Sequence, residues 1–205
     1  MGGSHASGLN RSLAGFARHI PLGLTLLRAL LAPVVLWLGF TSASPMGFAA
    51  CLIAAFLSDY FDGVIARRLG VATPGLRRLD SAADSLFYIA CVIVAWHLHP
   101  GAIRERWPVL AVLAALEVTR YVFDLVKFRR EASYHMWSSK FWGLTLFIGF
   151  YALLVHGHTG VLVSLAVYAG IVADLEGLAI SALLPRWQTD VPSFVHAIRL
   201  RQSAQ

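Results

Sequence analysis

The segment IPLGLTLLRALLAPVVLWLGF occupies residues 20–40 and contains a single charged residue, Arg28. A helix needs about 20 apolar residues to cross the hydrocarbon core of a bilayer, so this segment predicts a membrane-spanning helix. Further apolar stretches of similar length follow at residues 47–67, 79–98, 107–126, 136–156 and 160–184. The sequence therefore predicts an all-α integral membrane protein with six transmembrane helices.

The composition of the whole chain agrees with this prediction. Of the 205 residues, 58% are hydrophobic and 14% are charged, whereas soluble domains average about 50% and about 25%. These values exclude an ordinary soluble enzyme and an intrinsically disordered chain. The net charge of +6 comes from scattered basic residues, which we interpret as signals of membrane topology and not as a nucleic-acid surface. Cys51 and Cys91 lie in apolar stretches and are expected to be buried thiols.

The distribution of Lys and Arg predicts the orientation of the spans. Basic residues precede the first span and follow the second, fourth and sixth, whereas the opposite side carries only Arg104 and Arg106. Cytoplasmic loops hold the excess of Lys and Arg, so both termini are expected in the cytoplasm. The predicted organisation is a mobile start with a short interfacial amphipathic helix (residues 1–19), a membrane domain (20–185) and a cytoplasmic tail (186–205).

Acidic residues inside the apolar stretches are the most informative polar positions. Eight of the 11 acidic residues lie there, although a carboxylate in hydrocarbon needs a partner, water or a functional role. Asp59 and Asp62 fall near the cytoplasmic end of the second span, and Asp80 and Asp84 at the start of the third. This distribution predicts a polar cavity that opens to the cytoplasm.

The spacing of these four aspartates predicts a metal site. Asp59 and Asp62 share one helix face, and Asp80 and Asp84 are one turn apart on the next helix. Two helices joined by a short loop would then present four carboxylates toward one point. Four neighbouring carboxyl groups cannot all be ionised without cations beside them. Oxygen ligands suit Mg²⁺ or Mn²⁺. The structural alternative, in which the carboxylates only pair with arginines, is disfavoured by this spacing.

Small residues on the same helix face predict contact with a ligand. Gly63 and Ala66 lie on the face of Asp59 and Asp62 and leave room for a ligand to touch the helix backbone. Arg67 stands at the edge of this face, where its guanidinium group can hold a phosphate.

These residues resemble the signature of the CDP-alcohol phosphotransferases, D-x2-D-G-x2-A-R-x8-G-x3-D-x3-D. The matching runs are DYFDGVIAR at residues 59–67 and DSAAD at residues 80–84. The resemblance extends over nearly the whole chain through the six-span plan, the N-terminal interfacial helix and a first-span pattern of Pro21, Thr25, Arg28 and Pro33. Two positions depart from the family: Leu76 replaces a glycine, and Leu22 replaces the asparagine that usually follows the first-span proline.

The resemblance implies a phosphatidyltransferase of phospholipid biosynthesis. Such enzymes move the phosphatidyl group of a CDP-linked lipid, usually CDP-diacylglycerol, to a hydroxyl group of a small acceptor, and CMP leaves. By similarity, Asp59, Asp62 and Asp80 would hold one divalent ion, Asp80 and Asp84 a second, and Asp84 would be the general base. The expected contacts to the CDP-lipid are Leu22, Gly23, Leu24, Thr25, Gly63, Ala66, Arg67 and Thr73. A homodimer and a bacterial inner membrane are also expected from the resemblance.

The identity of the acceptor stays open at this stage. Arg120, Arg129 and Lys140 are candidates for binding a phosphate on the acceptor, which would favour glycerol 3-phosphate or an inositol phosphate. The same residues are equally explained as topology signals with snorkelling stems. Glu117 and Arg120 have i,i+3 spacing and predict an ion pair.

Two other functions are compatible with the pattern. A divalent-cation or proton transporter would use the carboxylates as its pathway, but the charges crowd toward one side and no acidic relay extends to the outer face. A catalytically impaired homologue is the second alternative, because Leu76 would narrow the substrate cleft or shift the loop.

Overall fold

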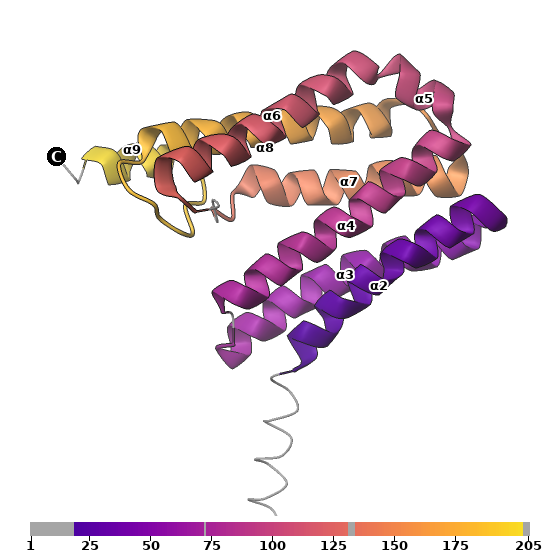
Figure 1. Ribbon diagram of the computed structural model, residues 1–205, viewed down its shortest axis with the longest axis horizontal. Helices are drawn as coiled ribbons and strands as arrows, with labels where there is room; N and C mark the ends of the chain where they lie inside the picture. Colours follow the sequence, from indigo (N-terminus) through magenta and orange to yellow (C-terminus); the bar gives the residue numbers. More distant parts are fainter. Residues whose placement is uncertain (1–18, 72, 131–133, 203–205) are drawn as a thin grey trace, which may run out of the picture. The chain divides into compact units, whose positions relative to one another are not determined.

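The computed structural model describes residues 19–71, 73–130 and 134–202 (Figure 1). Over this part of the chain the regular structure is helical and contains no β-strand, which confirms the predicted all-α class. The helices form two compact units, one ending at Leu98 and the other beginning at His99. Most of the predicted interfacial helix falls within residues 1–18, which lie outside the described part.

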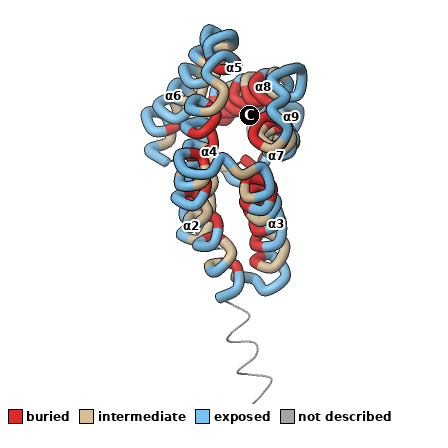
Figure 2. Tube along the Cα trace, turned by 90° about the vertical axis from the view of Figure 1, so that its right-hand side faces the viewer, coloured by how far each residue is buried: buried red, intermediate tan, exposed pale blue. Residues whose placement is uncertain are grey.

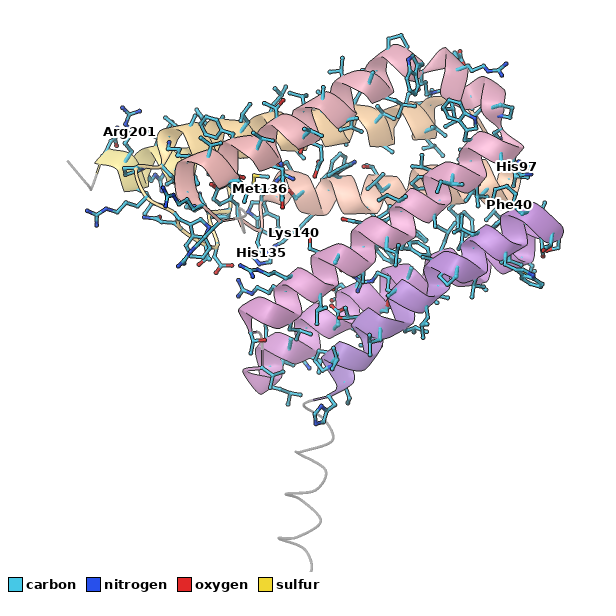
Figure 3. All side chains as sticks on the ribbon, viewed as in Figure 1. Phe40, His97, His135, Met136, Lys140 and Arg201 are labelled. Atoms are coloured by element: carbon cyan, nitrogen blue, oxygen red, sulfur yellow. The ribbon has the colours of Figure 1, made fainter. Side chains whose placement is uncertain are left out.

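From residue 19 onward, the described part of the first unit consists of three long helices, α2 (Ile20–Thr41), α3 (Pro45–Leu69) and α4 (Pro74–Leu98) (Figure 1). Helix α2 packs against both of the others. The core of this unit contains Val35, Phe48 and Phe87, one from each helix, and Figure 2 shows buried positions running along α3. Near the C-terminal ends of α2 and α4, the rings of Phe40 and His97 lie with their centroids 4.5 Å apart (Figure 3).

A glycine sets the close approach of α2 and α4. A Cβ atom placed on Gly39 would stand 2.6 Å from Cγ2 of the fully buried Val94. The absence of a side chain at this position therefore lets the two helices pack closely, as small residues do between membrane helices. Because α2 also packs on α3, it fixes the positions of both helices that carry the predicted metal ligands.

Local capping residues define both ends of α3 and the start of α4. Ser44 Oγ accepts a hydrogen bond from the backbone N–H of Gly47 at 3.3 Å and caps the start of α3. The helix ends at Gly70, whose φ of +66° is a left-handed conformation that glycine adopts at little cost. Thr73 Oγ1 then accepts a hydrogen bond from the N–H of Leu76 at 3.2 Å in the first turn of α4. Residues 70–73 alone connect the two helices, so their adjoining ends stay close.

Within residues 99–130 and 134–202, the second unit contains five helices, α5 (Pro100–Glu105), α6 (Trp107–Phe128), α7 (Trp137–His156), α8 (Val161–Leu183) and α9 (Phe194–Gln202). Helix α8 packs against α6, α7 and α9. Small residues line its contacts with α7: a Cβ atom on Gly149 would stand 3.0 Å from the Cβ of Ala166, and one on Gly170 would stand 2.7 Å from Nε1 of Trp142. Helix α8 is therefore the central element of this unit.

An apolar cluster packs around the C-terminal end of α8. Its buried members are Tyr134, Met136, Ile180, Leu184, Val191 and Ala197. The Tyr134 hydroxyl lies 2.9 Å from Ser181 Oγ, within hydrogen-bond distance, and burial raises the pKa of Tyr134. Val191 and Ala197 belong to the segment predicted as a cytoplasmic tail, so part of that segment packs onto the second unit.

Among the described residues, five helices are long and apolar enough to cross a membrane: α2, α3, α4, α7 and α8. They correspond to five of the six predicted spans. The remaining predicted span, residues 107–126, forms α6, which has 22 residues. Every 18-residue window of α6 contains at least three charged side chains, and this charge separates it from the other five helices.

Candidate metal and substrate site

Four aspartates from two helices come together in the first unit. Asp59 and Asp62 stand on α3, whereas Asp80 and Asp84 stand on α4. Carboxylate oxygens of Asp59, Asp62 and Asp80 all lie within 4.8 Å of one another. The members of each pair are three or four residues apart and share a helix face, and the short connection at residues 70–73 brings the two faces together. The structure thus gathers the residues that the sequence predicted to meet.

The four carboxylates surround the guanidinium group of Arg28, which α2 supplies. Its Nη1 lies 2.9 Å from Asp80 Oδ1 and 3.3 Å from Asp59 Oδ1, and it also donates to Asp84 Oδ1. Its Nη2 donates to Asp62 Oδ2 at 2.6 Å. The Arg28 side chain is only 1% exposed. One buried cation therefore contacts all four acidic groups.

The aspartate cluster is buried on one side and open on the other. The Asp62 side chain is 5% exposed and lies deepest, whereas the Asp59 side chain is 52% exposed. Asp80 and Asp84 are intermediate, each with about a third of the side chain exposed. A ligand that approaches from the open side would meet these three carboxylates first, with Asp62 and Arg28 beneath them.

The donor set fits a hard divalent cation. All four side chains offer carboxylate oxygens, which Mg²⁺ and Mn²⁺ prefer over nitrogen or sulfur. Oxygens on opposite sides of a Mg²⁺ ion are about 4.2 Å apart. Oxygens that already lie within 4.8 Å of one another would move little to share such an ion, whereas the Arg28 guanidinium group that contacts these aspartates would have to make room for it.

Small residues continue the site along α3. Gly63 follows the buried Asp62 directly, and a Cβ atom on Gly63 would stand 3.2 Å from Nη1 of Arg67. The guanidinium group of Arg67 therefore lies over the glycine, one turn away from the aspartates. Ala66 is buried and Arg67 is exposed. This arrangement places a cationic side chain over the helix backbone next to Asp62.

The predicted CDP-lipid contacts on α2 lie in its first turns. Gly23 is exposed, and a Cβ atom there would have no neighbour within 4 Å. Leu22 and Leu24 are partly exposed. Thr25 is buried, and its hydroxyl donates to the carbonyl of Pro21 at 3.1 Å. The exposed positions of this turn are open to a ligand, whereas the Thr25 hydroxyl is occupied by its own helix.

Thr73 and Leu76 belong to the start of α4. The Thr73 hydroxyl accepts the hydrogen bond from the Leu76 N–H that caps this helix. Leu76, the residue that departs from the family signature, has an ordinary helical conformation and no positive φ. A glycine is therefore not required there by the backbone, and the departure changes only the size of the side chain.

Arg120, a predicted acceptor-binding residue, is held by two acidic groups of the second unit. Its Nη2 lies 3.0 Å from Glu117 Oε1, which confirms the predicted i,i+3 ion pair. Its Nε lies 3.1 Å from Asp174 Oδ1 on α8, and Asp174 is only 2% exposed. A Cβ atom on Gly177 would stand 2.9 Å from Cδ of Arg120, so the arginine stem packs against this glycine. Arg120 thus compensates a buried carboxylate.

The other two predicted acceptor-binding residues are more exposed. Lys140 lies in the first turn of α7, with its Nζ 4.5 Å from the ring centroid of Trp137 (Figure 3). Arg129 directly follows the last residue of α6 and adopts a left-handed conformation with φ of +54°. Both side chains are exposed, unlike that of Arg120.

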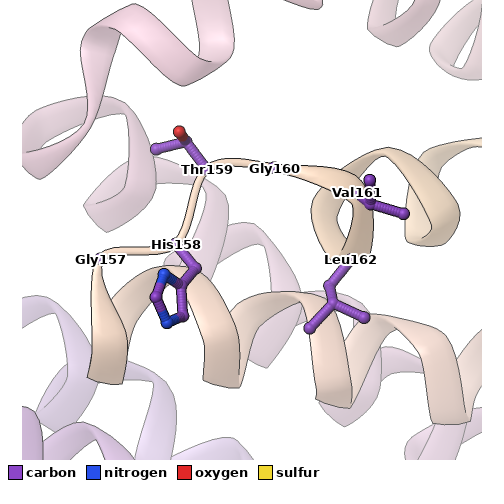
Figure 4. A pocket seen from close by; sticks show the side chains of 6 residues that line it. All are labelled: Gly157, His158, Thr159, Gly160, Val161 and Leu162. Carbon is purple, nitrogen blue, oxygen red and sulfur yellow. The ribbon is translucent and has the colours of Figure 1, made fainter.

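A surface hollow of about 470 Å³ lies at the loop between α7 and α8, lined by residues 157–162 (Figure 4). Arg106 holds this loop by donating to the carbonyls of Thr159 and Gly160 and, through Nε, to Ser164 Oγ at 3.0 Å. His158 is the one titratable side chain among the lining residues. The lining therefore lacks the paired acidic groups that mark the cluster in the first unit.

Arg28 is the site residue that sequence reasoning did not assign. An arginine in an apolar span requires a partner, and the aspartates lie at a similar depth in the neighbouring spans. That signal places Arg28 near the acidic residues in general terms. It does not reveal that one guanidinium group contacts all four carboxylates, because this depends on how α2 packs against α3 and α4.

Comparisons with known proteins identify relatives of the chain. A model of the CDP-alcohol phosphatidyltransferase family matches residues 18–173. Similar curated proteins include the CDP-diacylglycerol–glycerol-3-phosphate 3-phosphatidyltransferases of Salmonella choleraesuis, 42% identical over 85 residues, and of Escherichia coli strain K12, 39% identical over 84 residues. Each match covers 40% of this chain and 46% of the relative, so the chain spans about half the length of these relatives. No solved structure matches the chain.

Proposed function

The chain belongs to the CDP-alcohol phosphatidyltransferase family, and we propose that it transfers the phosphatidyl group of CDP-diacylglycerol to a hydroxyl group of a small acceptor, with release of CMP. The observation that carries this proposal is the convergence of four carboxylates from α3 and α4 at one point. Acidic groups inside apolar helices have a cost in free energy, so a cluster of them indicates a functional site.

The proposed ligands of the divalent ions are Asp59, Asp62, Asp80 and Asp84. Bound Mg²⁺ or Mn²⁺ ions would neutralise charge on the pyrophosphate and on the leaving phosphate. Arg67, exposed beside Gly63, binds a phosphate of the nucleotide with its guanidinium group. Gly63 has no side chain, so a phosphate held by Arg67 can lie close to the helix backbone.

Asp84 is the proposed general base. Its carboxylate belongs to the cluster but is about a third exposed, so an acceptor hydroxyl can reach it from the open side. It would take the hydroxyl proton as the oxygen attacks the phosphorus atom of the CDP-lipid. The bond between that phosphorus and the bridging oxygen breaks, and CMP leaves with this oxygen.

The amphiphilic substrate explains why the acidic cluster is built into apolar helices. The acyl chains of the lipid can stay in the bilayer while the nucleotide faces water. Extraction of the chains into water would cost about 0.8 kcal/mol for each CH₂ group. We propose six spans, in which α6 is the fourth in chain order. We also propose that both termini lie in the cytoplasm of a bacterial inner membrane, because the basic residues favour this orientation.

Glycerol 3-phosphate is the proposed acceptor, since the similar curated proteins are named for it. An inositol phosphate is the second candidate of the same chemistry. Lys140 and Arg129 are the proposed phosphate contacts because both are exposed cations. Arg120 is a weaker candidate, since two carboxylates already share its guanidinium group.

An acceptor panel tests this proposal. Purified protein is incubated with labelled CDP-diacylglycerol and Mg²⁺, together with glycerol 3-phosphate, an inositol phosphate, serine or no acceptor. The proposal predicts a phosphatidylglycerol phosphate product and CMP release only with the first of these. A different lipid product would reassign the acceptor, and absence of CMP release with every acceptor would contradict the transferase.

A further inference from the structure

Arg28 has a position that the proposed reaction does not explain. Its guanidinium group occupies the centre of the aspartate cluster, where divalent ions are expected. Nη1 contacts one oxygen from each of Asp59, Asp80 and Asp84. Three oxygens around a single cationic nitrogen are an arrangement that a small metal ion would also adopt.

The remaining donors of Arg28 are also engaged. Nη2 donates to Asp62 at 2.6 Å, and Nε lies 3.5 Å from the oxygen of Ser58. The Ser58 hydroxyl in turn donates to the carbonyl of Ala55 at 2.8 Å, so its oxygen is oriented toward the arginine. The guanidinium group is thus fixed at every nitrogen, although Arg28 reaches the cluster from α2 and not from the helices that carry the acids.

We propose that Arg28 is a displaceable internal counter-ion: it holds the four carboxylates together in the metal-free protein, and divalent ions compete with it for the same oxygens. This inference rests on the proposed function, in which the cluster binds divalent ions. Arginine stays protonated in proteins, so it cannot yield by losing its proton. The guanidinium group must move away from the oxygens as the metal binds.

Charge explains why Arg28 stabilises the four carboxylates without metal and why it competes with divalent ions. Without a cation, four carboxylates this close would repel one another strongly, and Arg28 reduces their formal charge from −4 to −3. Two divalent ions would add four positive charges to the same pocket. A guanidinium group left among them would then be repelled by the ions and deprived of its oxygens. Arg28 therefore stabilises the metal-free protein and opposes the binding of divalent ions.

The opposite role, a permanent support for the metal ligands, makes a contrary prediction. If Arg28 kept the carboxylates in place during metal binding, its removal would weaken the binding of metal. Under competition, its removal strengthens the binding of metal and destabilises the metal-free protein. The two roles are thus separated by the direction of one change in affinity.

Metal affinity of the purified full-length protein in detergent distinguishes these roles. Free Mn²⁺ is followed by electron paramagnetic resonance during titration of wild type and Arg28→Gln, without substrate. Competition predicts that Arg28→Gln binds Mn²⁺ about tenfold more tightly, a usual size for coupling between two ligands. It also predicts a lower unfolding temperature without metal and a larger increase on adding Mn²⁺. Unchanged or weaker binding by the folded variant would overturn the inference.

Three further variants make the result decisive. Arg28→Lys keeps the positive charge but has one ammonium nitrogen in place of the guanidinium group, so we expect a smaller increase in Mn²⁺ affinity than in Arg28→Gln. If Arg28→Gln does not fold, Mn²⁺ binding by Arg28→Lys that is equal to or weaker than that of wild type overturns the inference. Arg106→Gln is the control, because it removes an arginine of the second unit that is 14% exposed and ion-paired with Glu105, and Mn²⁺ affinity should not change. Asp80→Asn should abolish binding. If wild type and Asp80→Asn bind Mn²⁺ equally, the proposed metal site itself fails.

Discussion

Gly63 and Arg67 lie one turn apart on α3, and the guanidinium group of Arg67 rests over the glycine so closely that a Cβ atom there would stand 3.2 Å from Nη1. The pair begins immediately after Asp62, the deepest member of the aspartate cluster. The glycine thus sets the position of a cation beside the proposed metal site.

Replacement of Gly63 by alanine should therefore weaken binding of the nucleotide. The added methyl group would push Arg67 from its place by a few tenths of an ångström and cover the helix backbone. We expect the KM for CDP-diacylglycerol to rise roughly tenfold, comparable to the loss of one charge-assisted hydrogen bond.

Gly143→Ala is the matched control for this measurement, because a Cβ atom at Gly143 meets no atom within 4 Å. It should leave the KM unchanged. An unchanged KM in Gly63→Ala as well would remove Gly63 from the proposed substrate contacts.

Helix periodicity was sufficient to predict that Asp59 and Asp62 meet Asp80 and Asp84, because it depends only on spacing within two adjacent helices and on a short loop. The place of Arg28 was not predictable in this way. It depends on the register of α2 against the other helices, which is set by close packing such as that of Gly39 against Val94.

The ion pairs of Arg120 in the second unit also differ in how far the sequence predicted them. The contact between Glu117 and Arg120 is local, and its i,i+3 spacing predicted it. The contact between Arg120 and Asp174 joins α6 to α8, and sequence spacing contains no information about such a pair. The number of candidate spans among the described residues is five, and six were predicted. The charged residues of α6 account for this difference, because α6 is as long as α2.

Removal of divalent ions should abolish the reaction reversibly. Chelation with EDTA is expected to stop CMP release, and added Mg²⁺ or Mn²⁺ should restore it. Metal at a hundred times its Kd should also stabilise the folded protein by about 2.7 kcal/mol, visible as a higher unfolding temperature. Asp80→Asn should lose both effects; a metal-dependent temperature shift that survives in this variant would locate the metal elsewhere.

Close packing of α2 against α4 gives a prediction about stability. Gly39→Ala places a methyl group 2.6 Å from Cγ2 of Val94, which is fully buried and has little freedom to move. We expect a loss of about 1–3 kcal/mol in the free energy of unfolding, the usual cost of overpacking. Thermal unfolding in detergent measures this loss, with Gly143→Ala again as the control. Equal stability of the two variants would show that the helices can separate without cost.

Arg120 and Lys140 should respond differently to substitution. Arg120→Gln leaves Asp174 buried without its partner, and we expect a loss of about 3–5 kcal/mol of stability. Lys140→Gln removes an exposed cation, so stability should change by less than about 0.5 kcal/mol while the KM for glycerol 3-phosphate rises. Thermal unfolding and acceptor titrations separate the two effects. A stable Arg120→Gln variant with a raised acceptor KM would reverse these assignments.

The aspartate cluster of α3 and α4 is proposed to catalyse phosphatidyl transfer. The most direct test of this role is the rate of CMP release from CDP-diacylglycerol by wild type and Asp84→Asn, with Mg²⁺ and glycerol 3-phosphate present. The proposed base predicts that kcat falls by about 10²–10⁴-fold in the variant, while CDP still binds. CMP release by Asp84→Asn at the wild-type rate would contradict the account.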